Sequence, residues 1–189
     1  MRNIKIISLI FMAAGCVFMI GCKSKSKTPE PAQIINEWVY KTILLPDIKP
    51  VYIQKTDTTN ATDSIYKSCK YKILNYIDSS GCTGCRLRAS TWKTYIEEMG
   101  SQADFLFYFQ SKDKEAIITL LKRERFTNYP VYIDTAGQLN QMNKLPDNPL
   151  YQCFLLDNNN TVLAMGDPIS YPQVWELYKK IINGEEVKE

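Results

Sequence analysis

The chain has 189 residues, enough for one domain with a sizeable core and some additional segments. Hydrophobic residues make up 45% and charged residues 23%, the balance of an ordinary globular protein, and a net charge of +3 with no dense Lys/Arg stripe argues against a nucleic-acid-binding face. Histidine is absent, which excludes histidine-based metal sites, Ser-His-Asp triads and Cys-His nucleophile pairs. Any catalysis must therefore use cysteine, carboxylate, lysine or tyrosine side chains.

The first 22 residues have the pattern of an export signal. Arg2 and Lys5 form a short basic region, and residues 6–20 are apolar almost throughout but too few for a comfortable membrane span. The run ends at Cys22, where Met19-Ile20-Gly21-Cys22 resembles a bacterial lipobox whose cysteine is lipidated. Cys16 ends a competing lipobox, but Cys22 is favoured because polar sequence begins directly after it. An uncleaved anchor or a plain secretory peptide are the alternatives.

A linker, a short helix and a short strand are predicted after the signal. Residues 23–33 contain Lys, Ser and two prolines and are expected to form a solvated linker. Residues 34–45 begin with helical spacing and are expected to form a short helix that ends before Pro46. Residues 51–53 are a strand candidate.

The stretch from residue 71 to residue 99 carries the chemistry. Its apolar, β-rich start predicts a buried strand, and residues 78–81 interrupt it. From Cys82 the period becomes helical up to Gly100, which is a typical helix stop. Steps of four, three, four and three place one set of side chains on a single helix face: Cys85, Ala89, Trp92, Ile96 and Met99.

That spacing distinguishes the two thiols. Cys85 lies in line with the core face and is expected to be shielded, whereas Cys82 lies in the first helical turn and faces solvent. Unpaired backbone N–H groups and the positive end of the helix dipole favour a thiolate at Cys82, and Arg86 and Arg88 add positive charge. The sequence therefore predicts an exposed nucleophile with a partner one turn away, able to close a disulfide. The alternatives are a metal knuckle or an inert disulfide.

The remaining chain alternates strands and helices. We expect a helix capped by Ser111, with the basic cluster at its end (Lys122, Arg123 and Arg125) forming a solvated face. The other expected elements are a strand at 104–110, a strand at 130–134, one or two helical turns at 138–144, a hairpin of 152–157 with 161–165, and an amphipathic helix at 170–183. With right-handed crossovers this order gives a central sheet with helices on both faces.

A strand leading into Cys82-Thr83-Gly84-Cys85 at a helix start is the pattern of the thioredoxin superfamily. Residues 71–184 resemble its TlpA-type branch, the membrane-tethered thioredoxin-like proteins of bacterial envelopes. The resemblance implies an α/β, thioredoxin-like fold: a central mixed β-sheet with helices on both faces, plus an N-terminal β extension. The expected division is a lipoprotein signal peptide (1–22), a flexible linker (23–33), an extension packed on the main domain (34–68) and the thioredoxin-like domain (69–189).

The sequence departs from the family at three places. Gly81 stands where thioredoxins carry Trp, and Tyr76 stands where they carry a buried carboxylate, so the proton acceptor for Cys85 is unidentified. The family's cis-proline would fall at Tyr151, judged from Phe154-Leu155-Leu156-Asp157, while Pro149 lies two residues earlier. The substrate loop beside the sulfurs is accordingly assigned to Pro149, Leu150 and Tyr151, with the cis-proline either displaced to Pro149 or lost.

The resemblance implies an enzyme, a thiol-disulfide oxidoreductase in which Cys82 attacks and Cys85 resolves, and it favours the reducing direction. We expect a monomer without metal or cofactor, lipidated at Cys22, anchored to a membrane of the cell envelope and facing the periplasm. Its partners would be protein or small-molecule thiols and disulfides, and not nucleic acid. The alternatives are a redox-inert binding scaffold and a peroxiredoxin-type peroxidase, which would need Thr where Ser79 stands.

Two further cysteines, Cys69 and Cys153, are expected to behave as small buried hydrophobes. A disulfide between them is an alternative in an oxidising compartment. A four-cysteine zinc site is the third option, although structural zinc sites usually pair two CxxC knuckles and this chain has one.

Overall fold

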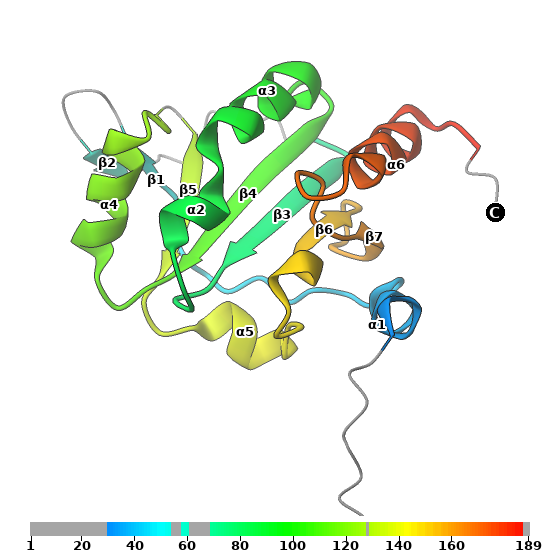
Figure 1. The fold of residues 1–189 in the computed structure, drawn as a ribbon, viewed down its shortest axis with the longest axis horizontal. Helices are drawn as coiled ribbons and strands as arrows, with labels where there is room; N and C mark the ends of the chain where they lie inside the picture. Colours follow the sequence, from blue (N-terminus) through cyan, green and yellow to red (C-terminus); the bar gives the residue numbers. More distant parts are fainter. Residues whose placement is uncertain (1–29, 54–57, 61–68, 128, 187–189) are drawn as a thin grey trace, which may run out of the picture.

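The computed structural model describes residues 30–53, 58–60, 69–127 and 129–186. The proposed signal peptide with Cys16 and Cys22 lies outside these residues, as does most of the predicted linker. Within the described residues, seven strands form one mixed sheet in the order β2-β1-β5-β4-β3-β6-β7 (Figure 1). The strands are β1 (Val51–Ile53), β2 (Thr58–Asn60), β3 (Tyr71–Ile77), β4 (Ala103–Gln110), β5 (Pro130–Asp134), β6 (Cys153–Leu156) and β7 (Val162–Met165).

The three central strands run parallel to one another, and the outer strands are antiparallel to their neighbours. β3 pairs in parallel with β4, which pairs in parallel with β5. On one side β6 and β7 form the predicted hairpin beside β3, and on the other side β1 joins β5. The predicted central mixed sheet is therefore confirmed.

Helices cover both faces of this sheet, as predicted. The helices are α1 (Pro31–Trp38), α2 (Thr83–Leu87), α3 (Ala89–Met99), α4 (Lys114–Arg123), α5 (Gln138–Asn143), the 3-10 helix η1 (Pro149–Tyr151) and α6 (Pro172–Asn183). α3, α4 and α6 pack on one face in a core that includes Trp92 and Trp175. α1 and α5 pack on the other face in a second core that includes Trp38 and Leu139.

Strand β4 shows why the central run of the sequence is apolar without interruption. Phe105, Phe107 and Phe109 enter the first core, whereas Leu106 and Tyr108 enter the second. Side chains alternate between the faces of a strand, so a strand covered on both sides needs apolar residues at every position.

The N-terminal helix differs from the prediction at both ends. It begins at Pro31, inside the predicted linker, because proline suits the first helical position and Glu30 and Gln33 form a capping box. It ends at Trp38 and not at residue 45, because Val39 leaves the helical conformation (φ −57°, ψ 132°) and Tyr40 then takes a positive φ of 70°.

The segment after α1 pairs with the outer edge of the β6–β7 hairpin. The Tyr40 N–H donates to the Val162 carbonyl at 2.8 Å, and the Val162 N–H donates to the Lys41 carbonyl at 2.8 Å. The Ile43 N–H donates to Asn160 at the same distance. Residues 40–43, called the N-terminal arm below, therefore cover this edge of the sheet.

The helix predicted after Cys82 is two helices. Arg88 has a left-handed conformation (φ 45°, ψ 52°) that ends α2 and precedes α3. A left-handed residue interrupts the regular rotation of about 100° per residue, so side chains before and after Arg88 no longer follow one helical spacing. The face that buries Ala89, Trp92 and Met99 therefore does not continue back to Cys85. Leu87 is the buried residue of α2.

A smaller correction concerns the cap of α4. The side chain of Asp113, and not that of Ser111, accepts the N-capping hydrogen bond, from the Ala116 N–H at 2.9 Å. None of the helices that the structure describes is long and apolar enough to cross a membrane.

Candidate active site

The turn between β3 and α2 presents the first cysteine. Asp78 follows β3 and accepts the Ser80 N–H at 2.8 Å. Gly81 then takes a φ of 78°, which favours glycine over any L side chain. The departure from the thioredoxin Trp at this position thus has a local cause, and the turn delivers Cys82 as the N-cap of α2.

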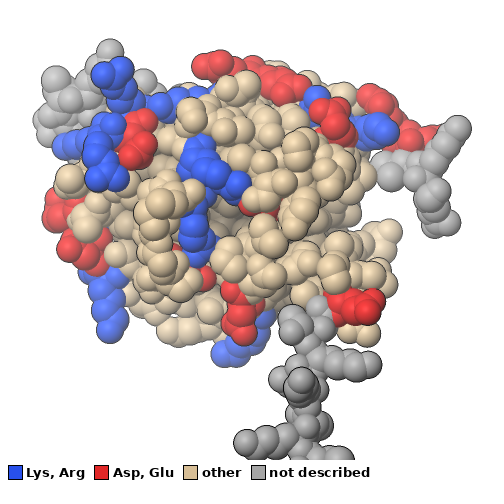
Figure 2. Space-filling view, viewed as in Figure 1, with Lys and Arg blue, Asp and Glu red and all other residues tan. Residues whose placement is uncertain are grey.

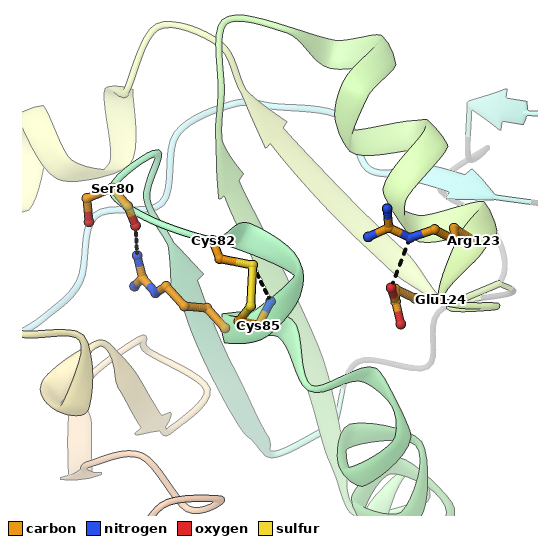
Figure 3. The surroundings of a disulfide bond; sticks show 6 residues. Ser80, Cys82, Cys85, Arg123 and Glu124 are labelled. Atoms are coloured by element: carbon orange, nitrogen blue, oxygen red, sulfur yellow. Dashed lines mark hydrogen bonds and ion pairs between the residues drawn. A yellow bond between two sulfur atoms is a disulfide. The ribbon is translucent and has the colours of Figure 1, made fainter.

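Cys82 and Cys85 form a disulfide with their Cα atoms 5.3 Å apart. The Cys85 N–H donates to Cys82 Sγ at 3.2 Å (Figure 3). Both cysteines are exposed, so the predicted shielding of Cys85 is wrong, and the break at Arg88 is the reason. α2 has only five residues, so this N–H contact, more than a long helix dipole, favours a thiolate at Cys82 in the reduced protein.

On one side of the disulfide, Arg86 ties the CxxC turn to the loop before β6. Its guanidinium pairs with Asp78 and donates to Gln152 Oε1 at 2.5 Å. Gln152 is buried and donates to Asp78 at 3.3 Å and to the Pro146 carbonyl at 2.7 Å. Burial raises the pKa of Asp78, but hydrogen bonds from Ser80, the charge of Arg86 and the Gln152 amide outweigh it, so the pKa lies below its usual value.

On the other side, Arg88 pairs with Asp167 in the loop between β7 and α6. Arg88 also donates to Ser170 Oγ at 2.9 Å, and that hydroxyl donates to Asp167 at 2.6 Å. Burial raises the pKa of Asp167, but the hydrogen bond and charge of Arg88 and the Ser170 and Ile169 donors lower it below its usual value. Both carboxylates therefore stay ionised at neutral pH.

A cavity of about 200 Å³ lies between these two ion pairs. Its lining includes Cys85, Arg86, Arg88, Asp167 and Ser170, together with Asn75, Tyr76, Ile77, Pro149 and Cys153. The site therefore has a hollow beside the second sulfur, bordered by both arginines.

The predicted substrate loop lies beside this hollow, but not in the expected conformation. Pro149 lines the cavity as the first residue of η1, and the Leu150 carbonyl accepts the Asp167 N–H at 2.8 Å. Tyr151 packs against the second core. All peptide bonds of the described residues are trans, so the cis-proline is lost and not displaced to Pro149.

The structure supplies no thioredoxin-like buried acid in the expected place. Tyr76 donates its hydroxyl hydrogen bond to Gln110, and burial raises its pKa to about 12. Asp78 and Asp167, whose pKa values are lowered, are poorly matched to a thiol as proton acceptors. Cys85 is exposed, so its thiol is accessible to solvent.

Cys153 is a buried thiol, as predicted, and it takes no part in a disulfide. Burial and the charge of Asp167 raise its pKa, which keeps it neutral and unreactive. Cys69 is of intermediate burial, so the prediction that it is a buried hydrophobe is wrong; its backbone N–H donates to Asp104 at 2.9 Å. The Cys69–Cys153 disulfide is thus not formed, and the zinc alternative loses two of its four ligands to the Cys82–Cys85 bond.

Three residues at the site were not found from the sequence: Gln152, Asp167 and Arg123. A Cβ placed on Gly84 would lie 3.1 Å from Leu120 Cδ1 and 3.5 Å from Arg123 Nη2, so the end of α4 lies against the CxxC turn (Figure 3). Nothing in the local sequence of Gln152 or Asp167 marks them, because their partners are distant in the chain. Arg123 was assigned to a solvated face; it is solvated, but beside the disulfide.

No protein-family model and no curated protein matches this sequence. Solved structures do match. Peroxidoxin BcpB from Mycobacterium tuberculosis is 15% identical with a TM-score of 0.54, over 79% of this chain and 99% of that one. A putative thiol-disulfide oxidoreductase from Bacteroides vulgatus is 18% identical with a TM-score of 0.51, over 71% of this chain and 87% of that one.

A thioredoxin-like protein in its oxidised form is 10% identical with a TM-score of 0.51, over 74% of this chain and 98% of that one. At such identities a likeness shows the fold alone. Together with the sheet order and the position of the CxxC turn, it establishes that this chain has a thioredoxin-like fold.

Proposed function

We propose that this protein is a thiol-disulfide oxidoreductase whose redox pair is Cys82 and Cys85. The observation that carries the proposal is the exposed Cys82–Cys85 disulfide, whose first sulfur accepts the Cys85 N–H at a helix N-terminus. A structural disulfide needs neither exposure nor a donor aimed at one sulfur. Both features favour a thiolate that leaves and attacks readily.

In the reducing direction, the Cys82 thiolate attacks a substrate disulfide. One substrate sulfur bonds to Cys82, and the other leaves as a thiolate. Cys85, deprotonated by solvent, then attacks Cys82 Sγ and releases the second substrate thiolate. Two electrons pass from the protein to the substrate, the Cys82–Cys85 disulfide remains, and an external dithiol must restore the reduced protein.

The proposal includes an envelope location. Residues 1–22 have the pattern of a lipoprotein signal with Cys22 as the lipid attachment site, and the protein would face the periplasm. The support for this part is the sequence pattern. We expect mass spectrometry to detect a thioether-linked lipid on the wild-type protein. The lipid should be absent from Cys22→Ser.

One observation favours a second candidate, a redox-inert binding scaffold. The loop opposite the sulfurs begins with a trans Pro149 in a 3-10 helix, whereas thioredoxin-like enzymes hold substrates beside a cis-proline. If that loop holds no substrate, the Cys82–Cys85 pair would serve only as a structural disulfide.

The test is the reduction potential of the pair and the pKa of Cys82, measured in the wild type by redox-buffer titration and in Cys85→Ser by thiolate absorbance. We expect a pKa below about 8.5 and a potential between about −270 and −200 mV. A potential below about −300 mV with an unshifted thiol would establish the scaffold. Rapid peroxide consumption at Cys82 would instead point to a peroxidase.

A further inference from the structure

The hollow beside Cys85 is rich in hydrogen-bond donors. Arg86 and Arg88 both line it, and its volume of about 200 Å³ exceeds that of a carboxylate with a few waters, since each water takes about 30 Å³. Figure 2 shows basic side chains near the middle of the face that carries α2. A group that occupies the hollow beside Cys85 therefore lies next to two arginine side chains.

Two N–H donors of the lining have no acceptor within the described part of the chain. They are Arg88 Nε and Asn75 Nδ2, and both are buried. A buried donor without an acceptor is costly, and both atoms belong to side chains that line the hollow, so this part of the site has more hydrogen-bond donors than the described acceptors satisfy.

The neighbouring carboxylates are already engaged. Asp167 accepts from Arg88, from Ser170 and from the Ile169 N–H at 3.0 Å. Asp78 accepts from Arg86, Ser80 and Gln152. These bonds hold the two guanidinium groups in place, and they leave no carboxylate directed at the unpaired donors.

Further positive charge lies on the opposite side of the disulfide. Gly84 lies between the two cysteines in the sequence, and Arg123 lies next to Gly84. The side chain of Arg123 is 71% exposed. Its ion pair with Glu124, at 3.2 Å, is a surface contact that an incoming anion can replace at little cost. Lys122 in the last turn of α4 and Arg125 just after the helix add positive charge nearby.

We propose that the site selects disulfides that carry a carboxylate close to the reacting sulfur, with Arg86, Arg88 and Arg123 as the residues that determine this specificity. The inference rests on the proposed function and names its substrate class. The carboxylate can belong to a small-molecule disulfide or to an acidic segment of a protein; the chemistry that recognises it is the same.

The test uses the fully reduced protein and three small disulfides of different charge: oxidised glutathione, which carries carboxylates, cationic cystamine and neutral bis(2-hydroxyethyl) disulfide. Each second-order rate constant is divided by that of dithiothreitol with the same disulfide, which removes intrinsic reactivity. We expect the normalised rate for oxidised glutathione to exceed that for cystamine about tenfold at low salt, as for one charge-assisted contact. The ratio should shrink as salt is added.

The three disulfides give different results when the inferred specificity fails and when the proposed function fails. If no disulfide reacts, the neutral one included, the oxidoreductase proposal itself fails. If all three react with equal normalised rates, the oxidoreductase stands and the carboxylate specificity is overturned. Disulfide-linked peptides with Glu or Lys beside the cysteine identify whether the carboxylate belongs to a small molecule or to a protein. A preference for Glu over Lys in the peptides, without a preference for oxidised glutathione over cystamine, assigns the carboxylate to a protein segment.

Two variants test the residues, with the glutathione-to-cystamine ratio taken within each variant. Arg123→Gln changes an exposed residue and should lower the ratio about threefold, within the range for an exposed ion pair. Arg88→Gln combined with Asp167→Asn removes both charges of this partly buried pair and should lower the ratio further. Lys41→Gln is the matched control, because Lys41 also forms an exposed ion pair but lies in the N-terminal arm, at the β7 edge of the sheet. An unchanged ratio in Arg123→Gln, or an equal fall in Lys41→Gln, would contradict the assignment.

Discussion

At the scale of single residues, the two cysteines have different surroundings although both are exposed. The Cys85 N–H donates to Cys82 Sγ, so a negative charge on Cys82 is stabilised, whereas no donor among the described residues makes a comparable contact with Cys85 Sγ. In disulfide exchange the thiolate is the reactive form, so attack is expected at Cys82 and resolution at Cys85.

This division predicts opposite outcomes for two serine variants. Cys85→Ser should accumulate a mixed disulfide between Cys82 and a small thiol, because no second sulfur resolves it. Cys82→Ser should react at least about tenfold more slowly, because its remaining thiol lacks the N–H contact. Intact-mass spectrometry after mixing with bis(2-hydroxyethyl) disulfide measures both, and faster adduct formation at Cys85 than at Cys82 would reverse the assignment.

The Arg88–Asp167 pair predicts an acid-sensitive stability. The pKa of Asp167 is lowered in the folded protein, so its contribution to stability is complete above the unfolded value of about 3.9 and is lost as the pH falls through the folded value. Urea unfolding should be followed from about pH 6 to about pH 2, a range that brackets the titration of the Asp167 carboxyl group. Over this range the free energy of unfolding should fall less steeply in Asp167→Asn than in the wild type. Identical slopes would show that Asp167 does not titrate as described.

Gln152 is a buried amide that joins three parts of the site. Gln152→Leu removes its bonds to Arg86, Asp78 and the Pro146 carbonyl, and should lower the free energy of unfolding by about 1–3 kcal/mol. Gln173→Leu, an exposed change on α6, should stay within about 0.5 kcal/mol. Chemical denaturation of both variants measures the difference, and similar values would remove Gln152 from the network.

At the scale of elements, hydrophobic periodicity predicted most helices and strands but missed the break at Arg88. The spacing from Cys85 to Met99 fits one helix, and nothing in it marks a left-handed residue, because arginine rarely adopts that conformation. The conformation is supported by partners in the β7–α6 loop, which local sequence does not reveal. The burial of Cys85 was therefore mispredicted by the same argument that correctly predicted the burial of Trp92.

Helix α4 offers a direct test of capping. Asp113→Ala removes the bond to the Ala116 N–H and should lower the free energy of unfolding by about 1 kcal/mol. Asp113→Asn retains an acceptor and should restore most of this loss. Thermal and urea unfolding compare the three proteins; a loss in Asp113→Asn equal to that in Asp113→Ala would attribute the effect to charge instead of the cap.

At the scale of the whole molecule, the sequence predicted the sheet and its two covered faces because alternating burial and element order are local properties. It did not predict that the N-terminal arm pairs with β7, nor that Trp38 packs on Phe154 with ring centroids 5.4 Å apart. These contacts join ends of the described chain, and no periodicity encodes them. The arm was expected to be helix, and its real position depends on an edge made by distant residues.

The second core predicts that this N-terminal segment unfolds together with the sheet. Trp38 is 5% exposed, and Trp38→Ala should cost about 3–5 kcal/mol while preserving a single unfolding transition. Tyr40→Ala, at a residue 80% exposed, should cost far less. Circular dichroism and tryptophan fluorescence should report the same midpoint in the wild type, whereas two separate midpoints would make the segment an independent unit.

The pairing of the N-terminal arm with β7 also bears on the order in which the protein assembles. The arm is synthesised before its hydrogen-bond partners at Asn160 and Val162, which lie far later in the chain. Contacts between such distant segments carry a large loop-closure entropy and form late in folding. Until the hairpin is made, Trp38 and Ile43 lack the part of the second core that Phe154, Leu156 and Val162 supply, so the growing chain exposes these apolar side chains for longer.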